Sequence, residues 1–332
     1  MIGKNLLLIM ITALILYGCK SKTQMIDGKI DTSLNLSPAE VELLVKREND
    51  TIKNLKPDNE ARIVWATPDK KEKTDYVLIY IHGFSASCKE AYPVNYDFAK
   101  RYGINLFCAR LAEHGIEDPE PLKNLTVENY FNSAKRAVEL GRLLGDKVIL
   151  MSTSTGGTQS LKLAADNPDV INALILYSPN VDLVDKSAHI LSSKAGYLLA
   201  KIIKGKIIKY DDPPEVQKYW QSKYHLNGPK VMIKLVETTM VPETFRRVKQ
   251  PVFLGYYFKN EKEKDPTVSV EAMLKMYDQL GTPADKKMKV AFPDAGCHPI
   301  ASSLFNKNYK EVEQKTFEFA EKILGLKPVS KY

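Results

Sequence analysis

Short apolar runs alternate with amphipathic segments along most of this chain. The apolar runs end at polar or turn residues and predict strands over 62–65, 76–81, 104–108, 148–151, 173–177, 252–257 and 288–292. Apolar residues recur at helical spacing over 92–101, 127–144, 155–166, 268–280 and 309–323. Strands that are apolar on both faces and joined by helices favour an α/β fold, with a mostly parallel central sheet covered by helices on both faces.

One long segment departs from this alternation. About 70 residues separate Asp182 from Pro251, many more than one crossover helix needs. The apolar pairs 198–199, 202–203 and 207–208 look helical, and a last helix near 231–238 leads back to the main fold. We therefore predict a helical cap at about 183–245. The aromatic residues Tyr219, Trp220 and Tyr224 are expected to pack within this cap, with a substrate wall as the alternative.

The first 36 residues have a pattern of their own. Lys4 precedes an uncharged apolar run over 6–16 that is too short to span a bilayer comfortably. Residues 1–18 resemble a bacterial lipoprotein signal peptide, which implies an exported protein whose Cys19 carries acyl chains such as palmitate. The expected location is a membrane of the cell envelope, on its periplasmic or cell-surface side. A plain secretory signal or a short membrane anchor is the alternative.

The chain then changes from a tether to a folded domain. Residues 19–36 are polar and predict a flexible tether, and the folded domain is expected over 37–332. Ser37 and Glu40 have the spacing of a capping box, and Pro38 suits the first turn, so a helix is predicted to begin there.

Charge and cysteine content narrow the function classes. The net charge of +8 comes mostly from scattered lysines, and no basic stripe interleaves with aromatics, so nucleic-acid binding is not predicted. Besides Cys19, the chain contains Cys88, Cys108 and Cys297, which allow at most one disulfide of unspecified pairing. The five histidines show no close Cys/His spacing, so no metal site is expected.

The junction after the apolar run 147–151 carries the first candidate for chemistry. Residues 152–157 read Ser-Thr-Ser-Thr-Gly-Gly and lead into a helix near Thr155. A serine at the apex of such a tight strand-to-helix turn has an exposed hydroxyl, and only small residues fit two places to either side. Ser154 is therefore a candidate nucleophile. The usual pattern is G-x-S-x-G, and here Ser152 replaces the first glycine.

Other polar residues follow other predicted strands, where ligand sites of open α/β sheets lie. They are His82-Gly83-Phe84 after 76–81, Asp182 after 173–177, Asp265 after 252–257 and His298 after 288–292. The order Ser, Asp, His resembles the α/β-hydrolase superfamily, and in particular serine hydrolases of the esterase, monoacylglycerol-lipase-like and serine aminopeptidase S33-like kind. The resemblance covers about residues 60–323, extends to the segment 110–115 with its His-Gly pair, and includes a helical cap between strands 6 and 7 of the family.

The resemblance implies a role for each residue. Ser154 is the nucleophile, and His298 is the base that takes its proton. Asp265 is the expected carboxylate partner of His298, while Asp182, Glu261 and Glu263 are alternatives.

The remaining positions of the family pattern concern the substrate. The backbone N–H groups of Phe84 and Thr155 are expected to form the oxyanion hole. Gly83 and His114 are expected to face the substrate, although a structural hydrogen bond is the favoured role of His114. His82 is expected to orient its loop. No cofactor or metal is needed for this chemistry.

The activity that follows is cleavage of a carboxylic ester through an acyl-enzyme. The enzyme would be a carboxylesterase or a monoacylglycerol-type lipase, acting on a small-molecule ester and held on the membrane by its N-terminal lipid. A peptidase, a thioesterase, a glycan deacetylase and a non-catalytic binding lipoprotein remain alternatives, because specificity depends on pocket shape. His189 and His225 are expected on the cap surface, and Cys297 is expected to be a packing residue or half of a disulfide.

Overall fold

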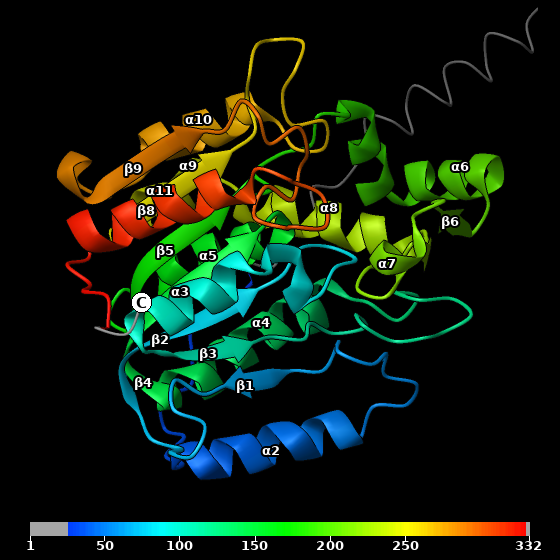
Figure 1. Cartoon of the computed structure of the whole chain (residues 1–332). Coiled ribbons are helices and arrows are strands. Elements are labelled where there is room, and N and C mark those ends of the chain that lie inside the picture. Colours follow the sequence, from blue (N-terminus) through cyan, green and yellow to red (C-terminus); the bar gives the residue numbers. More distant parts are fainter. Residues whose placement is uncertain (1–25, 330–332) are drawn as a thin grey trace, which may run out of the picture.

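A seven-stranded sheet forms the centre of the computed structural model, which describes residues 26–329 (Figure 1). The strands lie in the order β1-β3-β2-β4-β5-β8-β9. Their bounds are Arg62–Val64 (β1), Thr74–Ile81 (β2), Asn105–Cys108 (β3), Gly145–Thr153 (β4), Ile171–Tyr177 (β5), Val252–Tyr256 (β8) and Lys287–Ala291 (β9). All neighbours are parallel except β1, which pairs antiparallel with β3. The predicted mostly parallel sheet is confirmed.

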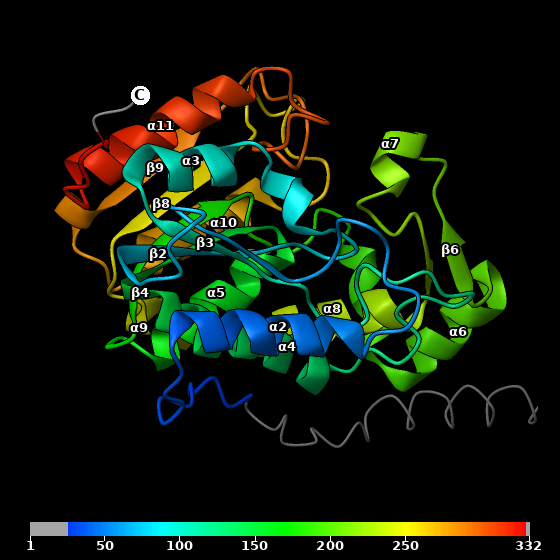
Figure 2. The ribbon, with the colours of Figure 1, turned by 60° about the horizontal axis from the view of Figure 1, so that its bottom comes forward.

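Helices cover both faces of the sheet, as Figure 2 shows. One face carries α3 (Val94–Tyr102) and α11 (Tyr309–Lys322), and the other carries α2 (Pro38–Asp50), α4 (Val127–Gly141), α5 (Thr155–Asp166), α9 (Pro242–Arg247) and α10 (Val270–Gln279). Short 3-10 helices occupy Cys88–Ala91 (η1), Arg142–Leu144 (η2) and Ala284–Lys286 (η4). Each face has its own apolar core, with Phe98 and Phe319 on the first and Phe131, Leu161 and Met273 on the second.

The cap is the insertion between β5 and β8. It consists of η3 (Lys186–Ser192), α6 (Lys194–Lys204), β6 (Ile207–Lys209), α7 (Pro214–Gln217), β7 (Lys223–His225) and α8 (Asn227–Thr239), followed by α9. The prediction of helix at 207–208 was wrong, because these residues form β6, which pairs antiparallel with β7. The apolar pair Ile207-Ile208 is short enough to suit either a strand or a helix, and the pairing partner decided between them.

The N-terminal segment is attached to the domain from residue 26 onward. The N–H of Gly28 donates to Asp166 Oδ2 at 3.0 Å, and the N–H of Ile30 donates to Asn167 Oδ1 at 2.9 Å. The Ile30 side chain is buried. The prediction of a flexible tether was therefore wrong for 26–36, since polar composition does not reveal a backbone that pairs with distant side chains. The predicted capping box of Ser37 and Glu40 begins α2 as expected.

Two further features concern the cysteines and the membrane-spanning potential of the described residues. Cys88 and Cys108 form a disulfide, which joins η1 to the end of β3, and Cys297 is the free cysteine of the described residues. Within residues 26–329, no helix combines the length and apolar character that crossing a bilayer requires. The predicted signal peptide and Cys19 lie outside the described residues.

Candidate active site

Ser154 occupies a strained turn between β4 and α5. Its backbone angles are φ 53° and ψ −124°, a region that non-glycine residues rarely adopt. The turn brings α5 against the end of β2 so closely that a Cβ on Gly156 would overlap the carbonyl oxygen of Ile81 and lie 2.7 Å from that of His82. Only glycine fits there, as the sequence pattern implied, and the turn holds Ser154 at the carboxyl end of the sheet.

Ser152 causes no visible distortion of this turn. It continues β4 and is paired with Ile81 on one side and Leu176 on the other. Its side chain is fully buried, and its hydroxyl has no hydrogen-bond partner among the described residues. The serine at the usual glycine position is therefore accommodated within the sheet, and Ser154 alone stands at the apex.

His298 is paired with Asp265. The Nδ1–H of His298 donates to Asp265 Oδ2 at 2.8 Å. The other oxygen, Oδ1, accepts from the N–H groups of Thr267 (2.9 Å) and Val268 (3.0 Å). These contacts fix the tautomer of His298 and leave Nε2 as its available atom. Nε2 is buried and has no partner within residues 26–329.

Charge and burial act in opposite directions on this pair. Burial by itself would raise the pKa of Asp265, but the charge and hydrogen bond of His298 together with the backbone donors hold the pKa below its ordinary value. Burial would lower the pKa of His298, but the Asp265 carboxylate raises it overall. The Asp265 carboxylate therefore stabilises the protonated imidazole of His298. A general base needs this stabilisation after it has accepted a proton.

The alternative carboxylates are engaged elsewhere. Asp182 contacts Lys186 and His189. Glu261 pairs with Lys264, and Glu263 pairs with Lys259. Of the four candidate acids, Asp265 is therefore the one that the fold brings to His298.

The loop after β2, residues 82–90, runs directly beside Ser154 and is called the β2 loop below. A Cβ on Gly83 would lie 2.9 Å from the Cβ of Ser154, so glycine permits the close approach. The Nδ1–H of buried His82 donates to the carbonyl of Gly83 at 2.8 Å, and its Nε2 accepts from the N–H of Leu111 at 3.2 Å. Burial, with His114 as a second cause, lowers the pKa of His82. His82 is thus a neutral side chain that shapes the β2 loop.

Two backbone N–H groups are available at this point of the fold. Thr155 is the first residue of α5, where helix N–H groups have no partner within the helix. Phe84 follows Gly83 in the β2 loop, and its ring packs edge-on against His114 and Tyr224. The two residues of the expected oxyanion hole therefore flank the Ser154 turn.

Glu90 is a residue that the sequence patterns missed. Its Oε2 accepts from the N–H of Gly83 at 2.6 Å and from the hydroxyl of Tyr80 at 3.2 Å, and Tyr80 also bonds Thr153 at 2.9 Å. Glu90 is only 3% exposed. Burial raises its pKa to about 7, an effect partly opposed by the hydrogen bond from Gly83 and by His298.

Nothing in the local sequence distinguishes Glu90. It follows Lys89, and such a charged pair is typical of a solvated turn. The fold turns η1 inward, so this carboxyl holds Gly83 from behind. Because one side chain contacts both the β2 loop and the residue before Ser154 through Tyr80, it links the two halves of the site.

His114 lies behind Phe84 and has no exposed surface. Its Nδ1–H donates to the carbonyl of Ala112 at 2.7 Å, and its ring stacks on Tyr130 with centroids 5.2 Å apart. Burial lowers its pKa to about 4. These contacts describe a neutral imidazole that supports Phe84 from within the core.

Several expectations for the remaining residues need correction. Tyr219, Trp220 and Tyr224 contact Lys89, Phe305 and Phe84 respectively, so they pack across to the main domain rather than within the cap alone. His225 was expected on the surface but is buried, and its N–H donates to the carbonyl of Pro121 at 2.7 Å. The physical reason is that the cap folds down onto the main domain.

Two other side chains are placed as follows. His189 is partly exposed and bonds Asp182 and Glu237. Burial raises the pKa of the Cys297 thiol to about 12, so it is protonated at neutral pH and is not a competing nucleophile.

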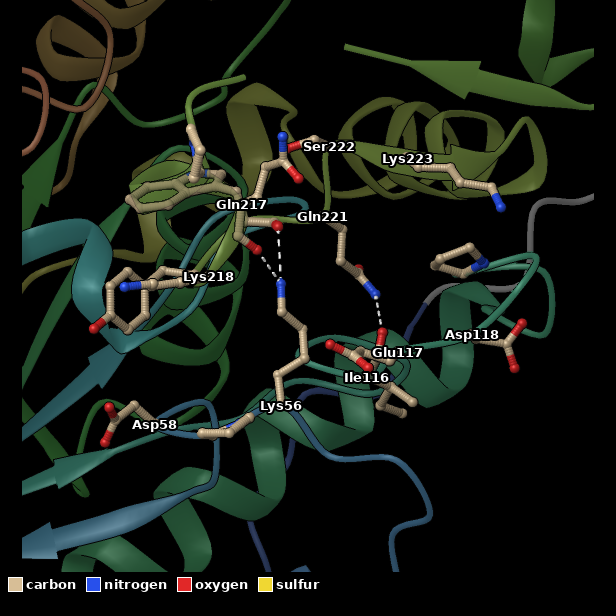
Figure 3. A pocket seen from close by; sticks show the side chains of 15 residues that line it. Lys56, Asp58, Ile116, Glu117, Asp118, Gln217, Lys218, Gln221, Ser222 and Lys223 are labelled. Carbon is tan, nitrogen blue, oxygen red and sulfur yellow. Dashed lines mark hydrogen bonds between the residues drawn. The ribbon is translucent and has the colours of Figure 1, made fainter. Parts of the chain in front are cut away.

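A groove of about 700 Å³ lies between the β1 side of the domain and the α7–β7 segment of the cap. Figure 3 shows Lys56 at its centre, with the ammonium group directed at the carbonyl oxygens of Gln217 and Trp220. Gln221 lines the groove, and its backbone N–H donates to Ser85 of the β2 loop at 2.7 Å. None of the predicted catalytic residues lines this groove.

Comparison with known proteins bears on the family and the fold of the chain. Residues 72–291 match the family model for serine aminopeptidases of family S33. No curated protein matches the chain in sequence.

Solved structures with the same fold are distant in sequence. One of two metagenome-derived lipolytic enzymes, LipS and LipT, is 14% identical, with a TM-score of 0.65, over 81% of this chain and 99% of that chain. A soluble variant of the Saccharomyces cerevisiae monoglyceride lipase, in complex with a substrate analogue, is 14% identical, with a TM-score of 0.58, over 81% and 97%. A monoacylglycerol lipase of Paleococcus ferrophilus is 14% identical, with a TM-score of 0.54, over 78% and 99%. The α/β-hydrolase fold expected from the sequence is confirmed.

Proposed function

Because the chain belongs to the serine aminopeptidase S33 family of α/β hydrolases, we propose that it is a serine hydrolase that cleaves carboxylic esters through an acyl-enzyme on Ser154. One observation carries the proposal. His298 is bonded to Asp265 through Nδ1, keeps Nε2 free within the described residues, and stands at the end of the sheet where Ser154 occupies the strained turn. Ser154 itself is only 7% exposed. Nucleophilic catalysis by a serine requires a histidine base that a carboxylate orients, and His298 with Asp265 supplies such a base.

In the first step, the Ser154 hydroxyl attacks the ester carbonyl while His298 Nε2 takes its proton. The new Oγ–C bond gives a tetrahedral intermediate, and the N–H groups of Phe84 and Thr155 hold its oxyanion. One such donor is worth about 3–4 kcal/mol of barrier. The bond from carbon to the alcohol oxygen then breaks, and the leaving alcohol takes the proton from His298.

The second step returns the enzyme to its starting state. His298 takes a proton from water as the water oxygen attacks the acyl carbon on Ser154. Collapse of the second tetrahedral intermediate breaks the bond to Oγ, which recovers the proton from His298. The products are a carboxylic acid and an alcohol, and Asp265 stabilises the imidazolium in both steps.

An ester is favoured over an amino-terminal peptide as substrate. An aminopeptidase needs a carboxylate that is ionised at neutral pH and free to bind the ammonium group of its substrate. Within residues 26–329, the acidic side chains that are hydrogen-bonded to the β2 loop or to His298 are Glu90, whose pKa is about 7, and Asp265, whose oxygens are already bonded. The lipolytic enzymes of the same fold also support the ester assignment.

A fluorophosphonate probe tests the serine mechanism. The wild-type protein is expected to be labelled once, and Ser154→Ala is expected to abolish labelling. Ser152→Ala is the matched control, since it removes a buried hydroxyl two residues away and should leave labelling intact. Equal labelling of Ser154→Ala and the wild-type protein would contradict the proposal.

Substrate class requires a separate assay. A panel of p-nitrophenyl esters of short and medium acyl chains is compared with aminoacyl amides of the same chromogenic type. We expect the esters to have the larger kcat/KM. Faster turnover of the aminoacyl amides would assign the protein to peptide hydrolysis instead.

The location is part of the proposal. The pattern of residues 1–19 supports export and lipid attachment at Cys19, and the Cys88–Cys108 disulfide suits an oxidising compartment. Mass spectrometry of the mature N-terminus is expected to find acylated Cys19, and Cys19→Ser is expected to release the protein from the membrane fraction. A mature N-terminus at another residue would refute the lipid anchor.

A further inference from the structure

The cap carries an unusual concentration of exposed apolar side chains. Seven of the twelve large hydrophobic residues that are exposed in the described part of the chain belong to the cap. Four of them, Leu198, Leu199, Ile202 and Ile203, lie on α6, and the last two are 74% and 70% exposed. Their spacing puts all four on one side of the helix, which we call the α6 face. Contiguous exposed apolar surface of this kind marks an interaction site.

α6 packs on the protein through residues outside the α6 face, among them Gly196 and Tyr197. A Cβ on buried Gly196 would overlap the carbonyl oxygen of Ile190, so the helix begins directly against η3. The ammonium group of Lys230 lies 4.7 Å from the centre of the Tyr197 ring. The α6 face is therefore turned outward by contacts that other residues of the helix make.

Lysine residues are concentrated in the segment that contains the α6 face. Between Asp185 and Asp211 the sequence contains no acidic residue, and it contains the lysines Lys186, Lys194, Lys201, Lys204, Lys206 and Lys209. Lys194 and Lys201 lie four residues before and three after Leu198, so they border the apolar side chains along one edge. An apolar stripe with lysines at its border is typical of a helix that lies in the plane of a membrane interface.

We propose that the α6 face docks on the surface of a bilayer that contains anionic lipid. Leucine and isoleucine side chains would enter the acyl boundary while the lysine ammonium groups reach the lipid phosphates, each gaining about 1 kcal/mol near a negative surface. A second copy of this chain fits the face less well, because two α6 faces in contact would bring the two sets of lysines together.

The attachment of the N-terminus is compatible with this orientation. In the view of Figure 2, the first described residues and α6 both lie toward the lower side of the molecule. A chain held by acyl groups before residue 26 could therefore touch the same bilayer with its cap. Docking does not depend on ester hydrolysis and can be measured without it.

Tryptophan fluorescence tests the docking on the full lipidated chain in phosphatidylglycerol–phosphatidylcholine vesicles. Ile202→Trp places a reporter on the α6 face, and Gln314→Trp places one at an exposed position of α11, on the upper side in Figure 2. Insertion is expected to shift the emission of the α6 reporter to the blue, and brominated acyl chains in the vesicles are expected to quench it. The α11 reporter should be unaffected. The parent chain supplies the background of Trp65 and Trp220. Equal quenching of both reporters, or no quenching of the α6 reporter, overturns the proposal.

A second measurement uses a charge-matched pair of variants. Ile202→Glu with Ile203→Glu adds two negative charges to the α6 face, and Gln314→Glu with Lys315→Gln makes the same change in net charge on α11. The first variant is expected to slow hydrolysis of a vesicle-embedded ester by about tenfold, with no change on a soluble ester, because two apolar contacts are lost. The second variant should act like the parent chain.

Each outcome separates docking from catalysis. If the parent chain hydrolyses neither ester, the proposed function is refuted. Quenching of the α6 reporter would still support docking in that case. A different result would refute bilayer docking and assign the α6 face to a second copy of the chain. In that case quenching is absent, the parent chain sediments as a dimer, and the variant with Ile202→Glu and Ile203→Glu sediments as a monomer.

Discussion

Two regions of the molecule differ in how their side chains are surrounded. One is the Ser154 turn with the β2 loop, and the other is the α6 face of the cap. Around Ser154, buried side chains hold the backbone and the candidate base in place: Glu90 bonds Gly83, His82 bonds the β2 loop and Asp265 bonds His298. On α6, large apolar side chains stand in solvent. The first region is over-determined by neighbours, as a site that retains a strained backbone must be. The second has few neighbours among residues 26–329, and its exposure is the basis of the proposed docking on a bilayer.

The largest expected effect concerns the acid of the proposed triad. Asp265→Asn should lower kcat for a p-nitrophenyl ester by roughly 10⁴-fold, because an amide no longer favours the required imidazole tautomer. Asp182→Asn is the matched control and should change kcat little, since Asp182 bonds Lys186 and His189 in the cap. A comparable loss in both variants would place the acid outside Asp265.

Glycine substitutions compare the two regions in stability. Gly156→Ala should lower the free energy of unfolding by about 3 kcal/mol or more, because its Cβ meets backbone oxygens that cannot move independently. Gly205→Ala, after α6, meets no atom within 4 Å and is strained only by its φ of +79°. That variant should lose about 1–2 kcal/mol. Urea unfolding of both variants checks the difference, and equal losses would contradict it.

The next prediction concerns the support that Glu90 gives to the β2 loop. Glu90→Ala should reduce kcat by about tenfold to a hundredfold, since Gly83 loses its support and the β2 loop shifts. Glu90→Gln retains an acceptor for the Gly83 N–H and should keep most activity. Nearly unchanged kcat in Glu90→Ala would show that Glu90 does not position the loop.

The same residue predicts a change of stability with pH. The pKa of Glu90 is about 7 in the folded protein against an ordinary value of 4.5, so the folded state binds the proton more tightly. The stability of the wild-type protein relative to Glu90→Gln is therefore greatest below pH 4.5 and falls as the pH rises to about 7. A shift of this size corresponds to roughly 3 kcal/mol. Unfolding of both proteins across this pH range measures it, and parallel curves would refute it.

The smallest effect is expected on the α6 face. Leu199→Ala should change the free energy of unfolding by less than about 0.5 kcal/mol, because the side chain is half exposed and packs little. Leu161→Ala in α5 removes the same atoms from a fully buried position and should cost about 3 kcal/mol. Thermal unfolding compares them, and a large loss for Leu199→Ala would show that the α6 face is packed within the protein.

Much of the fold and several site positions could be predicted from the sequence. Buried parallel strands are nearly continuous apolar runs, and the helices have clear periodicity, so their positions follow from local patterns. The glycine at 156 and the chain order of Ser154, Asp265 and His298 are also local or sequential features. The length of the insertion predicts the cap, but the isoleucine pair at 207–208 suits a helix as well as the strand β6 that it forms.

These local patterns could not predict contacts between residues that are distant in the sequence. A glutamate beside a lysine predicts a surface, yet Glu90 is buried because η1 turns toward Gly83. The segment 26–36 is polar, yet its backbone pairs with Asp166 and Asn167, which lie more than a hundred residues away in sequence. The pairing of Cys88 with Cys108 likewise depends on where η1 meets β3.

Local patterns therefore predict the strands of the central sheet, most of the helices that cover it, the tight turn at Ser154 and the order of the candidate residues, because each depends on neighbours along the chain. Tertiary structure alone decided which carboxylate meets His298, which glutamate supports Gly83 and which side of α6 stays exposed. Those outcomes depend on which distant surfaces come together, since burial, pKa and hydrogen bonding are set by neighbours in space. The Ser154 turn needed both, because a local glycine pattern permits the strain and the packing of α5 on β2 maintains it.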